Sequence, residues 1–196
     1  ALSNLSSNLL QTLASGERVL SLLAEEPELK DVESAVDLKD VSRIDVENVS
    51  FAYGEEQILS DVSLSVKKGE ILGIHGRSGS GKSTLLKLLM RFYDPKSGSI
   101  KINGEILPNI NTRSLRDNMA YITQQTYIFN ETIEENIRLA RRDATLDEIM
   151  EAAKKASIHD FILSLPEGYQ TKMTELGGNL SDGEKQRIGI ARAFLH

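Results

Sequence analysis

The stretch from Gly76 to Thr84 reads GRSGSGKST and decides how the rest of the chain is interpreted. It fits the pattern G-x-x-x-x-G-K-[ST] and lies between the apolar run Ile71–Ile74 and the leucine-rich segment Lys82–Phe92. A buried strand, a glycine-rich turn and a helix in this order predict a phosphate-binding loop. Glycines at 76, 79 and 81 permit the backbone angles that turn successive amide N–H groups inward. The dipole of the helix that starts near Lys82 then favours a polyphosphate at its N-terminus.

The polar residues of this loop have expected roles toward a bound polyphosphate. Lys82 is expected to reach the β and γ phosphates as a point charge, and the Ser83 hydroxyl is expected to ligate Mg²⁺. Thr84 stands where its backbone N–H reaches the α phosphate. The other predicted phosphate contacts come from the loop at Gly76, Ser78, Gly79, Ser80 and Gly81.

The spacing of apolar residues divides the chain into four segments. Leucines at steps of three and four predict a helix in residues 1–24, which either packs on its own domain or ends a helix of an upstream module. The acidic stretch from Glu25 to Asp45 is typical of a linker, which we place at residues 25–43. Residues 44–128 are predicted to form a core, and residues 129–196 a helical subdomain. Within the core we expect strands on both sides of Gly54 and at Ile71–Ile74, Ser99–Ile102 and Met119–Thr123, with a tight turn at Asn103-Gly104.

Composition excludes several classes of function. The 196 residues carry 23 Lys and Arg against 29 Asp and Glu, and this net charge of −6 argues against a basic nucleic-acid-binding surface. Because the chain has no cysteine, it contains no disulfide, cysteine zinc site or catalytic thiol. No apolar run reaches the 18 residues of a membrane span, and no signal peptide is predicted. The start without Met and the abrupt end at His196 suggest a piece of a longer protein, and His75 and His159 are expected to be structural.

The segment LSDGEKQRIGIARAF, from Leu180 to Phe194, resembles the signature motif of ABC-transporter ATPases, usually LSGGQ followed by a basic helical stretch. Leu180, Ser181 and Gly183 match this motif, whereas Asp182 replaces a Gly and Glu184 replaces the Gln. Independently of the family, Ser181 with Glu184 three residues later predicts a capping box at the start of a helix. A helix N-terminus with a hydroxyl and a glycine also suits phosphate binding.

Further matches follow in the order of the same family. Tyr53 in FAYG stands where the family stacks adenine on an aromatic ring. Gln124 in YITQQTYIF resembles the Q-loop residue whose amide oxygen ligates Mg²⁺ or orients the attacking water, with Gln125 as the neighbouring alternative. Glu175 in TELGGN resembles the X-loop residue that meets the coupling helices of the permease, although the family usually has Gly where Thr174 stands.

Two strings, RFYDPKSGSIKINGE from Arg91 to Glu105 and FNETIEENI from Phe129 to Ile137, resemble the exporter branch of the family. The resemblance implies an α/β fold, with a P-loop NTPase core, an antiparallel β subdomain and an inserted α-helical subdomain. It also implies a fused permease, so that residues 1–24 end the last membrane-domain helix and the parent protein lies at the cytoplasmic face of the cell membrane. ATP and Mg²⁺ are the expected cofactors, and substrate export is the expected function.

In such exporters two ATP-binding domains form a homo- or heterodimer, and Ser181 and Gly183 would act in trans on the partner's γ phosphate. Lys82 and Gln124 are the expected catalytic residues of this sequence. The family's Walker B carboxylates and switch His follow the signature helix, beyond His196, so the 196 residues are expected to turn ATP over negligibly. Two alternatives remain: a non-transport ABC-type ATPase of translation or DNA repair, and a degenerate site in a heterodimer, marked by Asp182 and Glu184.

Overall fold

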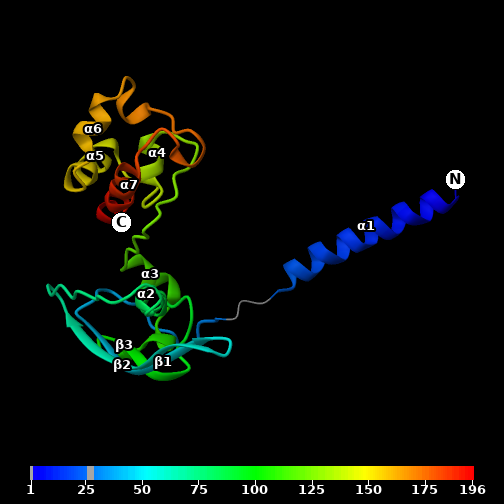
Figure 1. Ribbon diagram of the computed structural model, residues 1–196, viewed down its shortest axis with the longest axis horizontal. Coiled ribbons are helices and arrows are strands. Elements are labelled where there is room, and N and C mark those ends of the chain that lie inside the picture. The colour runs from blue at the N-terminus through cyan, green and yellow to red at the C-terminus, as the bar shows by residue number, and fades with distance from the viewer. Residues whose placement is uncertain (1, 26–28) are drawn as a thin grey trace.

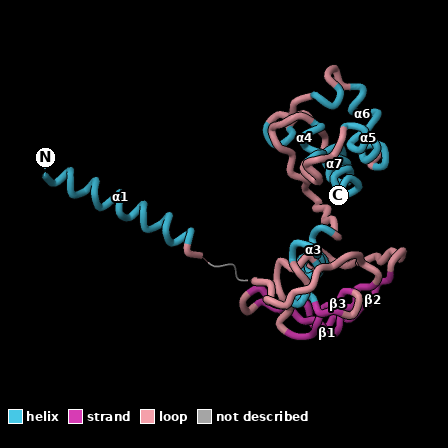
Figure 2. Tube along the Cα trace, turned by 180° about the vertical axis from the view of Figure 1, so that it is seen from behind, coloured by secondary structure: helices cyan, strands magenta, loops and turns pink. Residues whose placement is uncertain are grey.

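The computed structural model describes residues 2–25 and 29–196, with the side chains of residues 12–25 and 29–196. Its first element is the helix α1 (Leu2–Leu23), which extends away from the rest of the chain (Figures 1 and 2). A helix is thus confirmed where the leucine spacing predicted one, although the side chains of Leu2, Leu5 and Leu9 lie outside the described set. The apolar side chains described at its C-terminal half are exposed, Leu20 and Leu23 among them. Among the described residues, no helix combines the length and hydropathy that a membrane crossing requires.

A four-stranded antiparallel sheet forms the base of the second part of the molecule. Its strands are β1 (Arg43–Tyr53), β2 (Glu56–Lys67), β3 (Ser97–Ile102) and β4 (Glu105–Ile106), in the spatial order β2-β1-β3-β4. The predicted tight turn at Asn103-Gly104 and the strands predicted on both sides of Gly54 are confirmed. Gly54 joins β1 to β2 at φ 58°, and Asn103-Gly104 joins β3 to β4 with φ values of 54° and 87°.

Short helices cover one face of this sheet (Figure 1). They are α2 (Lys82–Leu89), the 3₁₀ turn η1 (Leu107–Asn109) and α3 (Thr112–Asp117). Alternate residues of β1 and β3 point toward them, because side chains on a strand alternate between its two faces. The resulting core contains Val46, Val49, Phe51, Leu59, Leu85, Leu88, Ile100, Ile102, Leu107, Ile110 and Leu115.

Two predicted strands of this part are wrong. Neither Ile71–Ile74 nor Met119–Thr123 forms a strand, and Ile71 is fully exposed while Ile122 is 42% exposed. An apolar run becomes a buried strand only where neighbouring strands pair with it, and none of the four strands of the described sheet does so. The helix after the loop is also shorter than expected, since α2 ends at Leu89 rather than Phe92.

A separate helical part follows (Figure 1). It comprises α4 (Ile133–Arg138), α5 (Leu146–Lys155), α6 (His159–Ser164), the turns η2 (Gly168–Gln170) and η3 (Glu175–Gly177), and α7 (Asp182–Leu195). Polar N-caps start three of these helices, at Thr132, Thr145 and Ser181. Their apolar faces form a second core, which includes Ile128, Ile133, Ile137, Ile149, Ile158, Ile162, Met173, Ile188 and Leu195. The helical character predicted beyond Glu131 is therefore confirmed.

One of the histidines has a structural partner in this helical part. His159 Nδ1 lies 2.8 Å from the hydroxyl of Tyr169, whose side chain is buried. Burial raises the pKa of Tyr169 to about 12. The pair ties the start of α6 to η2, which agrees with the structural role expected for this histidine.

The described part of the segment between α1 and β1 packs against the β-rich part. Val36 donates its N–H to Asn109 O at 2.8 Å and accepts from Asn111 N at 2.8 Å, in a parallel bridge with Ile110. Farther along, Leu38 N donates to Ser114 Oγ at 2.9 Å. Residues 29–42, called the connecting segment below, are therefore fixed to the core by hydrogen bonds.

Candidate functional site

The glycine-rich loop leads directly into α2, as its sequence predicts. Gly81 is the N-cap of α2, with φ at 87°, in the left-handed region that favours glycine. A Cβ at this position would lie 2.5 Å from Leu59 Cδ2 and 3.1 Å from Ile58 O on β2. Both the backbone angle and this close approach require glycine, so the loop is held against the sheet at its last residue.

The Lys82 ammonium group lies within the curve of the loop. Its Nζ donates to Gly76 O at 2.9 Å and to Arg77 O at 2.8 Å, and it lies 3.5 Å from Ser80 Oγ. These carbonyl contacts place a positive charge where the loop amides and the helix N-terminus already favour an anion. The contact of Lys82 with the β and γ phosphates stays a prediction.

The two residues after Lys82 differ in exposure. Ser83 is exposed on the first turn of α2, so its hydroxyl is accessible to a metal ion. Thr84 is buried at 8% exposure and packs its side chain toward the core. Since the first N–H groups of an α-helix have no partner within the helix, the Thr84 amide remains the group through which this residue can contact a phosphate.

Three aromatic rings cluster beside α2. The Tyr53 ring lies 4.9 Å from Phe51 and 5.3 Å from Tyr93, measured between ring centroids. Lys87 on α2 places its Nζ 6.0 Å from the centroid of Tyr53, whose side chain is 36% exposed. The sequence pattern predicted a role for Tyr53 but none for Tyr93, which lies in the string RFYDP. A partly exposed aromatic cluster of this kind offers a surface on which a flat base can stack.

The signature segment begins α7 with the predicted capping box. Ser181 N donates to Glu184 Oε2 at 2.7 Å, and Glu184 N donates to Ser181 Oγ at 3.4 Å. The Asp182 side chain is fully exposed, with one oxygen 3.9 Å from Lys185 Nζ. Two carboxylates thus stand on the first turn of α7, where the helix dipole stabilises negative charge.

The structure brings Gln124 and the signature segment together. Gln124, Gln125, Asp182, Gly183 and Gln186 line one pocket, of about 720 Å³. Both glutamines are exposed, and Thr123 Oγ1 donates to Gln125 O at 2.7 Å. The glycine-rich loop does not line this pocket, because it lies in the β-rich part while α7 lies in the helical part (Figure 1). Glu175 begins the turn η3, and the next residue, Leu176, is exposed with φ at 55°.

A buried polar network that the sequence analysis did not identify holds the residues after Gln125 to α7. Asn136 is completely buried and donates to Phe129 O at 3.0 Å and to Thr132 O at 3.0 Å, while its Oδ1 accepts from Phe129 N at 2.9 Å. Arg192 on α7 donates to Asn136 O at 2.7 Å and to Tyr127 O at 2.8 Å. Glu134, Glu135 and Asn136 all lie between Ile133 and Ile137, and only the helical spacing, which places Asn136 three residues after Ile133, was a signal available in the sequence.

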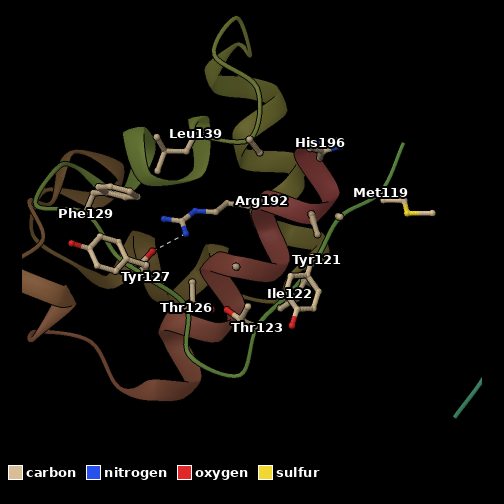
Figure 3. Close-up of a pocket in the computed structure, with 14 residues that line it drawn as sticks. Met119, Tyr121, Ile122, Thr123, Thr126, Tyr127, Phe129, Leu139, Arg192 and His196 are labelled. Atoms are coloured by element: carbon tan, nitrogen blue, oxygen red, sulfur yellow. Dashed lines mark hydrogen bonds between the residues drawn. The ribbon is translucent and has the colours of Figure 1, made fainter. Parts of the chain in front are cut away.

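Figure 3 shows Arg192 in the pocket beside this network, with Tyr127, Phe129 and Leu139 on one side and Tyr121 and Ile122 on the other. Burial lowers the pKa of the Arg192 guanidinium. Because its donors are used by backbone carbonyls of Tyr127 and Asn136, Arg192 fixes the course of the chain between Gln125 and α4. The Gln124 loop and the signature helix are therefore anchored to the same helical part.

Comparison with known proteins identifies the family. A family profile described as ABC transporter matches residues 59–196, which is more than half of the chain and includes both the glycine-rich loop and the signature segment. The chain belongs to the ABC transporter family. The resemblance drawn from the sequence motifs is thereby confirmed, together with the P-loop fold that combines an antiparallel sheet with several helices.

Relatives of this ABC chain are much longer proteins. It is 97% identical over its whole length to a probable ABC transporter ATP-binding/permease protein of Haemophilus influenzae, of which it covers 36%. It is 47% identical over 195 residues to a putative multidrug export ATP-binding/permease protein of Bacillus subtilis, of which it covers 34%. The chain thus spans about a third of the length of these curated relatives.

A solved structure is similar to the ABC chain as well. The structure of a bacterial Atm1-family ABC exporter with ATP bound matches with a TM-score of 0.89 and 40% sequence identity, over 94% of this chain and 33% of the exporter. The relatives are exporter-type ATP-binding/permease proteins, and the chain corresponds to their nucleotide-binding part.

Proposed function

We propose that the chain is the ATP-binding part of an exporter-type ABC transporter, which couples MgATP binding and hydrolysis in a dimer to the movement of a substrate across a membrane. The observation that carries this proposal is the loop of residues 76–81, with the Lys82 ammonium inside its curve and the N-terminus of α2 behind it. The names of the relatives supply the direction of transport, since they include multidrug export proteins.

The residues present fit a nucleotide and a magnesium ion. In this proposal the loop amides at Gly76, Ser78, Gly79, Ser80 and Gly81 and the amide of Thr84 hold the phosphates, and Lys82 neutralises them. Tyr53 and Tyr93 provide the aromatic surface for adenine. Ser83 and Gln124 hold Mg²⁺, which supplies further charge neutralisation on the phosphate oxygens when bound. The exposed Ser83 hydroxyl is accessible to the ion, whereas Gln124 lines the pocket of the signature segment, so its role requires that pocket to approach the loop.

The signature segment is proposed to act on a second ATP-binding domain. Ser181 and Gly183 lie on the first turn of α7, away from the glycine-rich loop of their own chain (Figure 1). An approach from the partner domain in a homo- or heterodimer brings them to that domain's γ phosphate. The loops that contain Gln124 and Glu175 are proposed to contact the permease, at the cytoplasmic face of the membrane.

The proposal also assigns the segments of the chain. Residues 1–24 end a membrane-domain helix, residues 25–43 connect it to the ATPase, residues 44–128 form the nucleotide-binding core, and residues 129–196 form the helical subdomain with the signature. The exposed apolar side chains of α1 support the first assignment, and the two separate cores support the last two.

The test is ATP hydrolysis by a full-length protein that carries this sequence, in detergent or in lipid. Lys82→Ala is expected to lower kcat/KM by about 100-fold or more, because it removes a charge that stabilises the transferring phosphoryl group. Lys68→Ala is the matched control, because Lys68 is an exposed lysine in the turn after β2, and we expect an unchanged rate. Equal rates for the wild type and Lys82→Ala would contradict the proposal.

The 196 residues by themselves are proposed to turn ATP over negligibly, because their sequence contains no match to the family's Walker B carboxylates or switch His. Phosphate release from this polypeptide at the rate of the full-length protein, abolished by Lys82→Ala, would refute the proposal of negligible turnover. The degenerate-site alternative is tested by Asp182→Gly in the full-length protein, since Asp182 adds an exposed negative charge at the signature. An unchanged ATPase rate in that variant would remove the alternative.

A further inference from the structure

Arg91 occupies an unusual position at the end of the helix that follows the glycine-rich loop. It comes directly after the C-cap of α2, Met90, with φ at 49°. Arg91 N donates to Leu88 O and Phe92 N donates to Lys87 O, which is the hydrogen-bond pattern of a helix end that usually has glycine where Arg91 stands. An arginine at a glycine position carries a backbone cost, and its side chain must account for its presence.

The Arg91 side chain binds the connecting segment. It is 3% exposed, and its Nη1 donates to Asp31 Oδ1 at 2.8 Å and to Thr112 Oγ1 at 3.2 Å. Its Nη2 donates to Lys30 O at 3.2 Å. Asp31 accepts a second hydrogen bond from Thr112 N at 3.0 Å and a third from the Thr112 hydroxyl. We call Asp31, Arg91 and Thr112 the latch.

The latch joins two elements that are about 60 residues apart in sequence. Asp31 lies in the connecting segment, which leads from α1 to β1 and is bonded to Asn109 and Asn111 through Val36. Arg91 lies at the C-terminal end of α2, and Lys82 lies at the other end of this helix, about 12 Å away along its axis. A hydrogen-bonded helix of two turns is stiff, so a displacement of the connecting segment reaches the phosphate loop through Arg91.

Stability alone does not explain this arrangement. An ion pair with one buried partner contributes little net stability compared with apolar side chains of similar size, and glycine would relieve the backbone at position 91. The bonds of Arg91 are also directed, because a guanidinium fixes the orientation of its carboxylate partner. The contact therefore sets the position of the connecting segment relative to α2.

We propose that the Asp31–Arg91–Thr112 latch transmits movement of the segment after α1 to the phosphate loop, which makes Asp31 and Arg91 positioning residues for ATP hydrolysis. This inference rests on the proposed function, in which α1 continues from a membrane domain. Breaking the latch then slows ATP turnover, and α1 no longer responds to bound nucleotide. ATP binding itself persists, because the loop and Lys82 are unchanged.

The primary variant is Asp31→Asn in the full-length protein, because Asp31 is partly exposed and the change keeps its size while removing its charge. We expect kcat for ATP to fall about fivefold and KM to change less than about twofold. A fivefold change is at the lower end of the factors by which one site typically affects another. Asp37→Asn, at an exposed aspartate of the same segment, is the matched control and should leave both constants unchanged. Asp31→Glu keeps the carboxylate and should restore part of the lost rate.

The second measurement is hydrogen exchange of residues 12–25 with and without MgATP. In the wild type and in Asp37→Asn, addition of MgATP is expected to change exchange in this segment, and in Asp31→Asn that change should be lost. A merely structural role would lower the melting temperature of Asp31→Asn and leave the ATP-dependent exchange in place, and that result would overturn the proposal.

The outcomes also separate the latch from the proposed function. If Asp31→Asn matches the wild type in kcat and in ATP-dependent exchange, while Lys82→Ala is inactive, the latch does not transmit movement and the ATPase assignment stands. If Lys82→Ala and the wild type hydrolyse ATP equally, the proposed function itself fails. Thr112→Val, which removes only the hydroxyl of the latch, should reproduce a weaker form of the Asp31→Asn effect, and a wild-type result for both variants would overturn the latch.

Discussion

The β-rich part and the helical part each have a buried core, yet they differ in how the backbone around that core forms its hydrogen bonds. In the helical part, segments from Ile128 to Leu195 fold onto one another. In the β-rich part, the sheet and α2 bury Val49 and Leu88 completely, while Ile71 beside the phosphate loop is fully exposed. A helix satisfies its backbone within itself, whereas a strand needs a neighbour. Each helix of the helical part therefore forms its backbone hydrogen bonds without a neighbouring element, whereas the phosphate loop follows an apolar stretch of the β-rich part that forms no strand and is exposed.

This contrast places the two nucleotide-binding motifs in different surroundings. The signature segment starts a helix with a complete capping box, and Leu180 and Ile188 on either side of this box belong to the helical core. The glycine-rich loop and the apolar run before it are exposed over residues 71–80, and the loop is held at its end by Gly81 and α2. Because protection from local opening follows buried contacts and hydrogen bonds, we expect the loop to open more readily than the signature turn.

The largest expected effects come from removing one core side chain in each part. Leu88→Ala and Ile149→Ala each truncate a completely buried residue, and each should lower the free energy of unfolding by about 2–5 kcal/mol. If the two parts are separate units, hydrogen exchange rises mainly in the part that carries the change. Leu86→Ala and Leu146→Ala, at exposed positions of the same helices, are the controls with small effects. Equal loss of protection in both parts would show one cooperative unit instead.

The second-largest expected effect comes from the buried Asn136 network of the helical part. Asn136→Ala leaves Phe129 N and Arg192 Nη2 without the Oδ1 acceptor and removes one of two hydrogen bonds at the carbonyls of Phe129 and Thr132, and should cost about 3 kcal/mol of stability. Exchange at residues 126–131 should rise more than at α5, because these residues lose their anchor. Asn130→Ala, at an exposed asparagine of the same string, should change stability by less than about 0.5 kcal/mol. A similarly small cost for both variants would show that the Asn136 network does not stabilise the helical part.

Local signals explain which features the sequence predicted correctly. The loop before α2, the Asn103-Gly104 turn and the Ser181–Glu184 capping box each depend on residues within a few positions of one another. The strand at Ile71–Ile74 failed because pairing depends on neighbours that a short pattern does not contain. Asp31 and Arg91 are about 60 residues apart, and the Asn136–Arg192 contacts span 56, so no spacing rule connects them. The string RFYDP marked the family without revealing what its arginine binds.

The third effect concerns how the loop is attached to the sheet. Gly81→Ala places a Cβ 2.5 Å from Leu59 Cδ2 in a left-handed conformation, and should cost about 2–4 kcal/mol through backbone strain and overpacking combined. Gly79→Ala is the matched control, because φ is 81° there but no atom lies within 4 Å of the added Cβ, so only the strain of about 1 kcal/mol applies. Urea unfolding of the two variants measures the difference. Equal costs would mean that Gly81 does not anchor the loop.

The smallest effect compares two capping boxes in the helical part. Thr145 and Glu148 at the start of α5 exchange the same two hydrogen bonds as Ser181 and Glu184 at the start of α7, at 2.8 and 3.3 Å against 2.7 and 3.4 Å. Thr145→Ala and Ser181→Ala should therefore each lower stability by about 1 kcal/mol.

The Thr145→Ala and Ser181→Ala variants should differ only in their ATPase rates. Thr145→Ala leaves the ATPase rate of the full-length protein unchanged, since α5 lines neither the loop nor the pocket of Gln124. Ser181→Ala slows hydrolysis by more than its stability cost explains, because the same hydroxyl is proposed to contact the partner's nucleotide. Equal rates for the two variants would mean that Ser181 serves only as a helix cap, and the proposed contact in trans would then have to come from the backbone of Gly183.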